Sequence, residues 1–112
     1  MLHNSTWHRL VDAIKPFRPA VRVKWSGDTE PTVWGPWVII SSVSYLETGN
    51  LGPVPFREVE WVEIDLARQG VSGRLVESGS AKWRESVLAA LTDAGLSFPV
   101  VDNKIRVIAN DA

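Results

Sequence analysis

Cysteine is absent from the 112 residues, which excludes a disulfide framework and any thiolate metal site. Long hydrophobic runs are absent too, because no stretch approaches the roughly 20 apolar residues that a membrane helix needs. The first ten residues include polar and charged side chains where a secretion signal would have its apolar segment. We therefore expect no membrane association and a cytoplasmic protein.

Histidine is scarce, and the common catalytic motifs are missing. His3 and His8 are the only histidines, whereas a metal site needs three or four converging ligands. No serine lies in a Gly-x-Ser-x-Gly motif, and residues 70–73 lack the Lys-Ser/Thr ending of a phosphate-binding loop. We expect no catalytic residue, no cofactor and no metal. The least favoured alternative is a small enzyme that uses carboxylates such as Glu58 and Glu60.

Hydrophobic residues make up 45% and charged residues 22% of the chain, which suits one globular domain over residues 1–112. Apolar periodicity predicts helices at residues 6–15 and 80–93, with Ser80 as N-cap and Gly95 after the second helix. Alternation predicts strands at residues 21–25, 33–42 and 56–65 and a hairpin within residues 98–108. Residues 48–55 and 66–79 read as loops, the second with a short extended piece around residues 74–76. The predicted fold is α+β, with two helices packed on an antiparallel or mixed sheet of four to six strands.

Tryptophan is abundant, with six residues. Those that fall on predicted inner stripes, where each would bury a large area, are Trp7, Trp25, Trp61 and Trp83. Trp34 and Trp37 flank a Gly-Pro pair that interrupts the strand pattern, so we expect at least one of these two rings to be exposed.

Charge is unevenly distributed although the net charge is only −1. Residues 1–27 contain five basic residues and one acidic residue, whereas residues 28–65 contain seven acidic residues and one basic residue. Such blocks can pair internally when the chain folds. Alternatively, the acidic block forms a surface whose negative charge attracts a basic partner.

The strand at residues 56–65 changes its alternation midway. Val59 and Trp61 would share one face, whereas Val62 and Ile64 would share the other. One β-bulge at Trp61 and Val62 would turn all four apolar side chains inward. The carboxylates that this bulge would gather on the outer face are Glu58, Glu60, Glu63 and Asp65. The alternative is a regular strand with both faces partly covered.

A basic patch near the start of the chain is the one candidate for nucleic-acid binding. It consists of Arg18, Arg22 and Lys24 beside Trp25, and basic residues interleaved with an aromatic ring can hold single strands. Trp25, however, shares a strand face with the apolar residues Val21 and Val23, so it belongs to the predicted core. We expect no nucleic-acid partner, since the total charge is also close to neutral.

Three segments, residues 4–10, 22–24 and 56–64, resemble a group of small bacterial proteins. The shared motifs are an Asn-x-x-Trp-x-x-Leu opening and a later Glu-Trp-(Val/Ile)-Glu-Ile strand. These proteins are similar in size and acidity to the immunity proteins of bacterial toxin systems. The resemblance implies an immunity-type protein that neutralises a cognate toxin by binding it, and it carries over no catalytic residue.

The expected partner is a toxin or effector that is basic at its active site. The expected contacts on this chain are the carboxylates Glu58, Glu60, Glu63 and Asp65, joined by Trp34, Asp28, Glu30 and Glu47. The alternative is a housekeeping interaction domain, or a self-assembling one such as a homodimer, without enzymatic activity.

Overall fold

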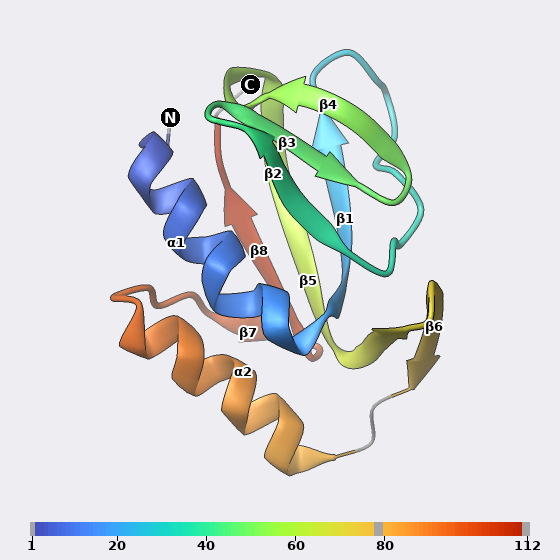
Figure 1. Ribbon diagram of the computed structural model, residues 1–112, viewed down its shortest axis with the longest axis vertical. Coiled ribbons are helices and arrows are strands. Elements are labelled where there is room, and N and C mark those ends of the chain that lie inside the picture. Colours follow the sequence, from blue (N-terminus) through green and yellow to red (C-terminus); the bar gives the residue numbers. More distant parts are fainter. Residues whose placement is uncertain (1, 78–79, 111–112) are drawn as a thin grey trace.

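In the computed structural model, which describes residues 2–77 and 80–110, two antiparallel sheets combine with two α-helices (Figure 1). The large sheet has the strand order β1-β5-β8-β7, and β6 pairs with the far end of β5. Its strands are β1 (Pro19–Trp25), β5 (Val59–Val71), β6 (Arg74–Glu77), β7 (Val100–Val101) and β8 (Lys104–Ile108). The small sheet, in the order β2-β3-β4, consists of β2 (Val38–Ser42), β3 (Tyr45–Thr48) and β4 (Leu51–Pro55). The α+β class is therefore confirmed, although the strands form two sheets instead of the one expected.

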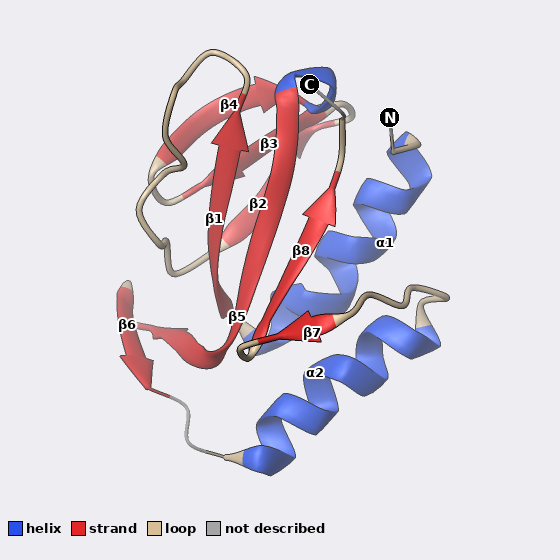
Figure 2. Cartoon of the chain, turned by 180° about the vertical axis from the view of Figure 1, so that it is seen from behind, coloured by secondary structure: helices blue, strands red, loops and turns tan. Residues whose placement is uncertain are grey.

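The helices lie on the same side of the large sheet as the small sheet does. They are α1 (Asn4–Ile14) and α2 (Ala81–Asp93). Of the two 3-10 turns, η1 (Lys15–Phe17) connects α1 to β1, and η2 (Phe56–Glu58) connects β4 to β5. Figure 1 shows α1 and the small sheet in front of the large sheet, with α2 beside α1. From behind, β1, β5 and β8 carry no helix in front of them (Figure 2). One face of the large sheet is thus left uncovered by the described residues.

The hydrophobic core fills the space between the large sheet, α1 and the small sheet. The apolar stripe of α1 is buried, and the ring of Trp7 stacks on Phe56 with 4.8 Å between the centroids. Val62 and Ile64 on β5 meet this stripe from the sheet side. Burying each such side chain contributes roughly 1.5–3 kcal/mol, so α1 is held mainly by this packing.

Local signals at the ends of the elements are confirmed by the structure. The Ser80 hydroxyl accepts a hydrogen bond from the Trp83 N–H at 3.2 Å, and Gly95 follows α2 with φ of +78°. Asp102 and Asn103 both have positive φ, of 53° and 59°. That conformation is the tight turn expected between β7 and β8.

The prediction of a loop at residues 48–55 is wrong for its second half, which forms β4. Pro53 and Pro55 lack an N–H and so cannot join a central ladder. They are tolerated because β4 lies at the edge of the small sheet and pairs only with β3. The proline and glycine residues of this segment favoured a loop in the sequence, although its second half forms an edge strand.

The loop predicted at residues 66–79 is wrong for residues 66–71, which belong to β5, whereas the extended piece expected around residues 74–76 is confirmed as part of β6. β5 continues through the buried Leu66 to Val71, and a turn at Ser72 and Gly73 leads into β6. Residues 78–79 lie outside the described part. At the other end, the strand expected from residue 56 begins only at Val59, because Phe56–Glu58 forms η2. The strand expected from residue 33 begins at Val38.

None of the helices in residues 2–77 and 80–110 combines the length and the apolar character that crossing a bilayer requires.

Gly70 offers a test of how closely the β1–β2 connection packs on β5. A Cβ at this position would overlap the Pro36 carbonyl, whereas one at Gly52 would meet nothing within 4 Å. Because backbone atoms at Pro36 must move, we expect Gly70→Ala to lower the free energy of unfolding by about 1–3 kcal/mol. Gly52→Ala is the control, with a change of less than about 1 kcal/mol. Urea denaturation measures both, and equal effects would contradict the packing described.

Candidate functional site

The β-bulge in β5 lies at Glu60, one residue before the expected position. Lys24 of β1 pairs with Trp61, but the next residue, Trp25, pairs with Val59. Glu60 is therefore the extra residue, and its carboxylate lies 3.4 Å from the Lys24 ammonium. The expected bulge at Trp61 and Val62 is thus corrected.

This shift decides which side chains of β5 face the core. Val59, Val62 and Ile64 lie in the core, whereas Trp61 is only partly buried and is not among the core residues. Trp61 therefore shares the uncovered side of the sheet with Glu63, two residues further along the strand. The prediction of Trp61 as a core residue is wrong, because it assumed that both apolar pairs turn inward.

Glu63 lies at the centre of a charged row that crosses three strands. Arg22 on β1 and Arg106 on β8 are its direct neighbours in the sheet register. The Nε atom of Arg22 lies 2.6 Å from one Glu63 oxygen, and Arg106 donates from Nε and Nη2 to the other oxygen at 3.0 and 2.9 Å. Glu63 is only 6% exposed. Glu63 therefore lies on the outer face, as expected, but the arginines cover its carboxylate and keep it from solvent.

Asp65 has a similarly enclosed environment. Only 4% of it is exposed, and its oxygens accept hydrogen bonds from the Ala67 N–H at 2.8 Å and from Arg68 Nε at 2.9 Å. These bonds stabilise the bend at which β5 leaves the register of β1. Asp65 thus shares the outer face with Glu63, but its carboxylate is enclosed and bonded within the chain instead of being free for a partner.

Two tryptophan rings lie between the arginines that hold these carboxylates. The guanidinium carbons of Arg22 and Arg68 lie 4.7 and 5.2 Å from the ring centroid of Trp34. Those of Arg106 and Arg22 lie 4.1 and 5.7 Å from that of Trp61. Each cation–π contact contributes roughly 0.5–2 kcal/mol, depending on its exposure. We call the set Arg22, Trp34, Trp61, Glu63, Arg68 and Arg106 the Arg–Trp face.

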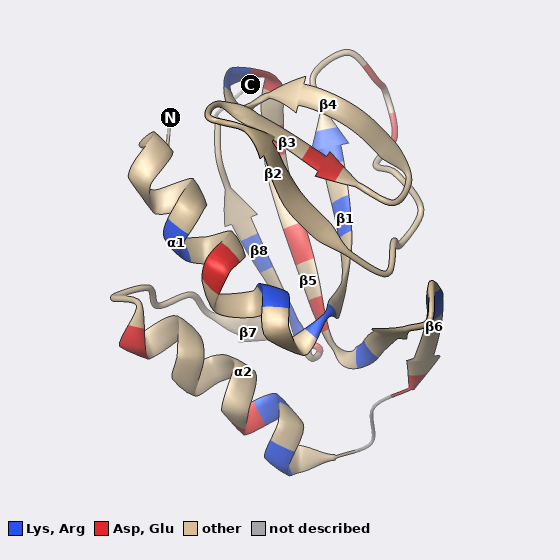
Figure 3. Ribbon diagram, in the orientation of Figure 1, with Lys and Arg blue, Asp and Glu red and all other residues tan. Residues whose placement is uncertain are grey.

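The charge of the Arg–Trp face and its flanks is basic, contrary to the acidic surface expected. Figure 3 shows blue bands on β1 and β8 on either side of red bands on β5. Four cationic side chains, Lys24 and the three arginines, form salt bridges with the three carboxylates of Glu60, Glu63 and Asp65, and Lys104 is the register neighbour of Asp65 on β8. Arg106 keeps 48% of its side chain exposed. Two residues of the basic N-terminal block, Arg22 and Lys24, therefore pair with the acidic middle block, which supports the first of the two alternatives for this part of the block.

The other expected contact residues are dispersed. Glu58 lies in η2, half-buried, and Glu47 lies on β3 of the small sheet, also half-buried. Asp28 and Glu30 are exposed in the connection between β1 and β2. Only Trp34 joins the Arg–Trp face. The structure therefore does not gather the eight expected residues on one surface.

Sequence reasoning missed Arg68 and Arg106 as members of the site. The outward alternation of β1 at Arg22 and Lys24 was visible, and the same period at Lys104 and Arg106 marks the outer face of β8. Two basic strands flanking one acidic strand would have indicated internal pairing. That β1 and β8 are the neighbours of β5 depends on the order of strands in the sheet, which local sequence patterns do not specify.

The groups that could support catalysis or metal binding do not converge in the described residues. His8 is half-buried, with its Nε2 3.1 Å from the Val43 carbonyl oxygen, and His3 is exposed. Across residues 2–77 and 80–110, no three His, Cys, Asp or Glu side chains are placed to hold a metal ion. The enclosed carboxylates Glu63 and Asp65 are engaged by arginines instead.

Removal of the central carboxylate charge tests the role of Glu63. We expect Glu63→Gln to lower the free energy of unfolding by about 2 kcal/mol, because it weakens charge-assisted hydrogen bonds to both Arg22 and Arg106. Glu60→Gln is the matched control, since its longer, more exposed pair with Lys24 contributes less than about 1 kcal/mol. Equal losses in thermal or urea denaturation would contradict the central position of Glu63.

Comparison with known proteins identifies a family. Residues 1–109 match a family of unknown function (DUF6678), and this match covers all strands and helices described above. No curated protein and no solved structure matches the chain. Because the match spans nearly its full length, the chain belongs to the family of unknown function DUF6678.

Proposed function

We propose that this protein acts without catalysis, by binding another protein through the Arg–Trp face. The observation that carries the proposal is the stack of three arginines and two tryptophans over a sheet face that the described residues leave uncovered (Figure 2). Arg and Trp are the residue types most enriched at binding hot spots. A face built of them on three rigid strands is well suited to recognition.

Preorganisation supports this use of the face. Glu63 holds Arg22 and Arg106 by ion pairs, and the indole rings restrain the same guanidinium groups from their sides. Long arginine side chains normally lose about 0.5–1.5 kcal/mol of rotamer freedom each when a partner immobilises them. Here folding has already restricted them, so less of that cost falls on association.

The chemistry of the face indicates a partner that presents carboxylates beside apolar side chains. Cations outnumber carboxylates on the face, and the flanking Val101 and Ile108 are 66% and 52% exposed. The proposed partner is therefore acidic at its contact surface, which reverses the charge expected from the sequence. A protein fits better than a nucleic acid, because two guanidinium groups already cover each indole ring that a base would stack on.

The narrower proposal is an immunity-type role, in which the partner is a cognate toxin that this chain neutralises by stoichiometric binding. It is supported by the motif resemblance at residues 4–10 and 56–64 and by the small size of the chain. A housekeeping or self-assembling interaction domain would use the same face with a different partner. The identity of the bound protein separates these roles.

The proposal predicts that binding depends on Arg106, the most exposed arginine of the stack. When the chain is co-expressed with the product of the neighbouring gene, we expect a one-to-one complex by size-exclusion chromatography with light scattering. Arg106→Ala should weaken binding about 30-fold by calorimetry, as expected for a hot spot of about 2 kcal/mol. The affinity should also fall as salt concentration rises.

Arg74→Ala is the control, because Arg74 is exposed on β6 outside the face. It should leave the affinity within about twofold of that of the unchanged chain. A neighbouring gene product that does not bind, with homodimer as the only assembly, would contradict the immunity role. A complex that is indifferent both to Arg106→Ala and to salt would contradict the Arg–Trp face as the binding surface.

A further inference from the structure

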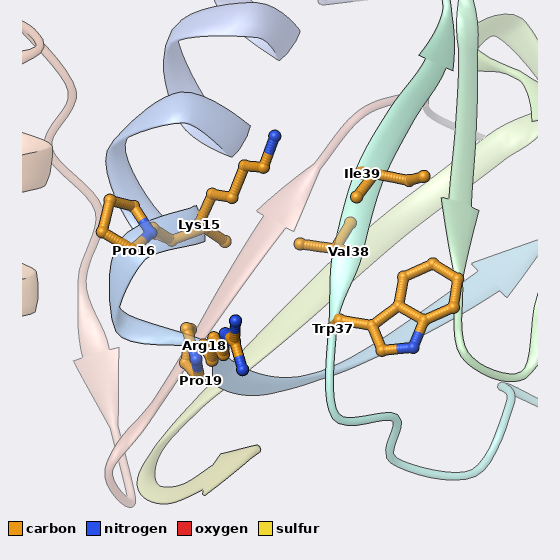
Figure 4. A pocket seen from close by; sticks show the side chains of 8 residues that line it. Lys15, Pro16, Arg18, Pro19, Trp37, Val38 and Ile39 are labelled. Atoms are coloured by element: carbon orange, nitrogen blue, oxygen red, sulfur yellow. The ribbon is translucent and has the colours of Figure 1, made fainter. Parts of the chain in front are cut away.

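A concave site lies between the end of α1 and β2, apart from the Arg–Trp face. It is a cavity of about 470 Å³, which is within the usual range of small-molecule sites. Its lining shares no residue with the Arg–Trp face. Figure 4 shows Lys15 extending from the end of α1, Arg18 at the start of β1, and Val38 directed from β2 toward them.

The walls of this cavity are apolar and its charged residues are all cationic. Ile39 and Trp37 supply most of the accessible apolar surface, since Trp37 is 36% exposed whereas Ile14 and Val38, which also line the cavity, are almost completely buried. Of the residues that the structure describes, the charged ones that line it are Lys15 and Arg18. Among the described residues neither forms a salt bridge, in contrast to the arginines of the Arg–Trp face.

The two cations are carried on a stiff turn. Pro16 and Pro19 restrict φ on either side of the turn, and Arg18 itself adopts φ of 51°. The Arg18 N–H donates to the Ile14 carbonyl at 3.2 Å, and the Arg18 carbonyl accepts from the Gly70 N–H at 2.7 Å. The backbone that presents both cations is thus fixed at two points.

We propose that this cavity binds a small organic anion with an apolar body, of the medium-chain carboxylate class. Lys15 and Arg18 take the carboxylate, since charge-assisted hydrogen bonds from ammonium and guanidinium groups are the strong ones. The apolar chain lies against Val38, Ile39 and Trp37, where its burial provides the affinity. This is a site separate from the protein-binding face.

The test is a titration of the isotope-labelled full chain with octanoate, followed by amide and indole resonances in NMR. We expect saturable shifts at Val38, Ile39 and the Trp37 indole N–H. Octylammonium, which has the same chain with the opposite charge, should bind at least about tenfold more weakly, because Lys15 and Arg18 repel it. Equal binding of the two probes, or shifts confined to other parts of the chain, would overturn the proposal.

A double variant locates the anion contacts. Lys15→Ala with Arg18→Asn should weaken octanoate binding about tenfold or more, because both charged donors are lost. Asn is chosen at position 18 because it tolerates the left-handed backbone conformation. Lys82→Ala with Arg74→Ala removes two exposed cations elsewhere and should leave binding unchanged. Unchanged binding in the first double variant, with its melting temperature preserved, would overturn the assignment, and the test is independent of any protein partner.

Discussion

The ion-paired row Arg22–Glu63–Arg106 is the interaction on which the outer side of the large sheet depends. A carboxylate that is 6% exposed requires compensation for its lost hydration. The neighbouring strands supply that compensation, because β1 and β8 both place a guanidinium group directly beside Glu63. The same two guanidinium groups also make cation–π contacts with Trp34 and Trp61. The buried carboxylate of Glu63 therefore positions side chains from three strands and from the connection between β1 and β2.

The bulge at Glu60 makes this arrangement possible. Without the extra residue, Val59 would lie on the face of Trp61 and Glu63 and would leave the core. With it, Val59 packs inward beside Val62, while Trp61 turns to the outer side and meets Arg106. A single irregularity in the backbone therefore satisfies both the apolar core and the polar stack. Bulges commonly aim side chains at functional surfaces in this way.

The layered fold separates two surfaces of different character. Packing of α1 and the small sheet on one face of the large sheet leaves its opposite face free for the Arg–Trp stack. On the packed side, η1 and the residue after it bring Lys15 and Arg18, which form no salt bridge with the described residues, to a cavity against β2. The first surface is broad and internally neutralised in part, which suits a protein partner. The second is concave and cationic, which suits a small anionic ligand.

Local chemistry in the sequence predicted the elements whose causes are local. The N-cap at Ser80, the glycine after α2 and the Asp102–Asn103 turn each act within a few residues, so their patterns were readable. The α+β class followed from the same periodicities.

What only the tertiary structure decided is the neighbourhood of each charge. Arg22, Glu63 and Arg106 are more than 40 residues apart in sequence, and strand order is set by the competition of non-local pairings. Of the seven acidic residues in the block at residues 28–65, the three on β5 have cationic partners, and Glu63 has one on each side. The sequence by itself determined how much charge the chain carries and where its local turns lie. The fold determined that the carboxylates of β5 are paired within the sheet, because strand pairing places Glu60 and Glu63 beside bases that are far away in the sequence.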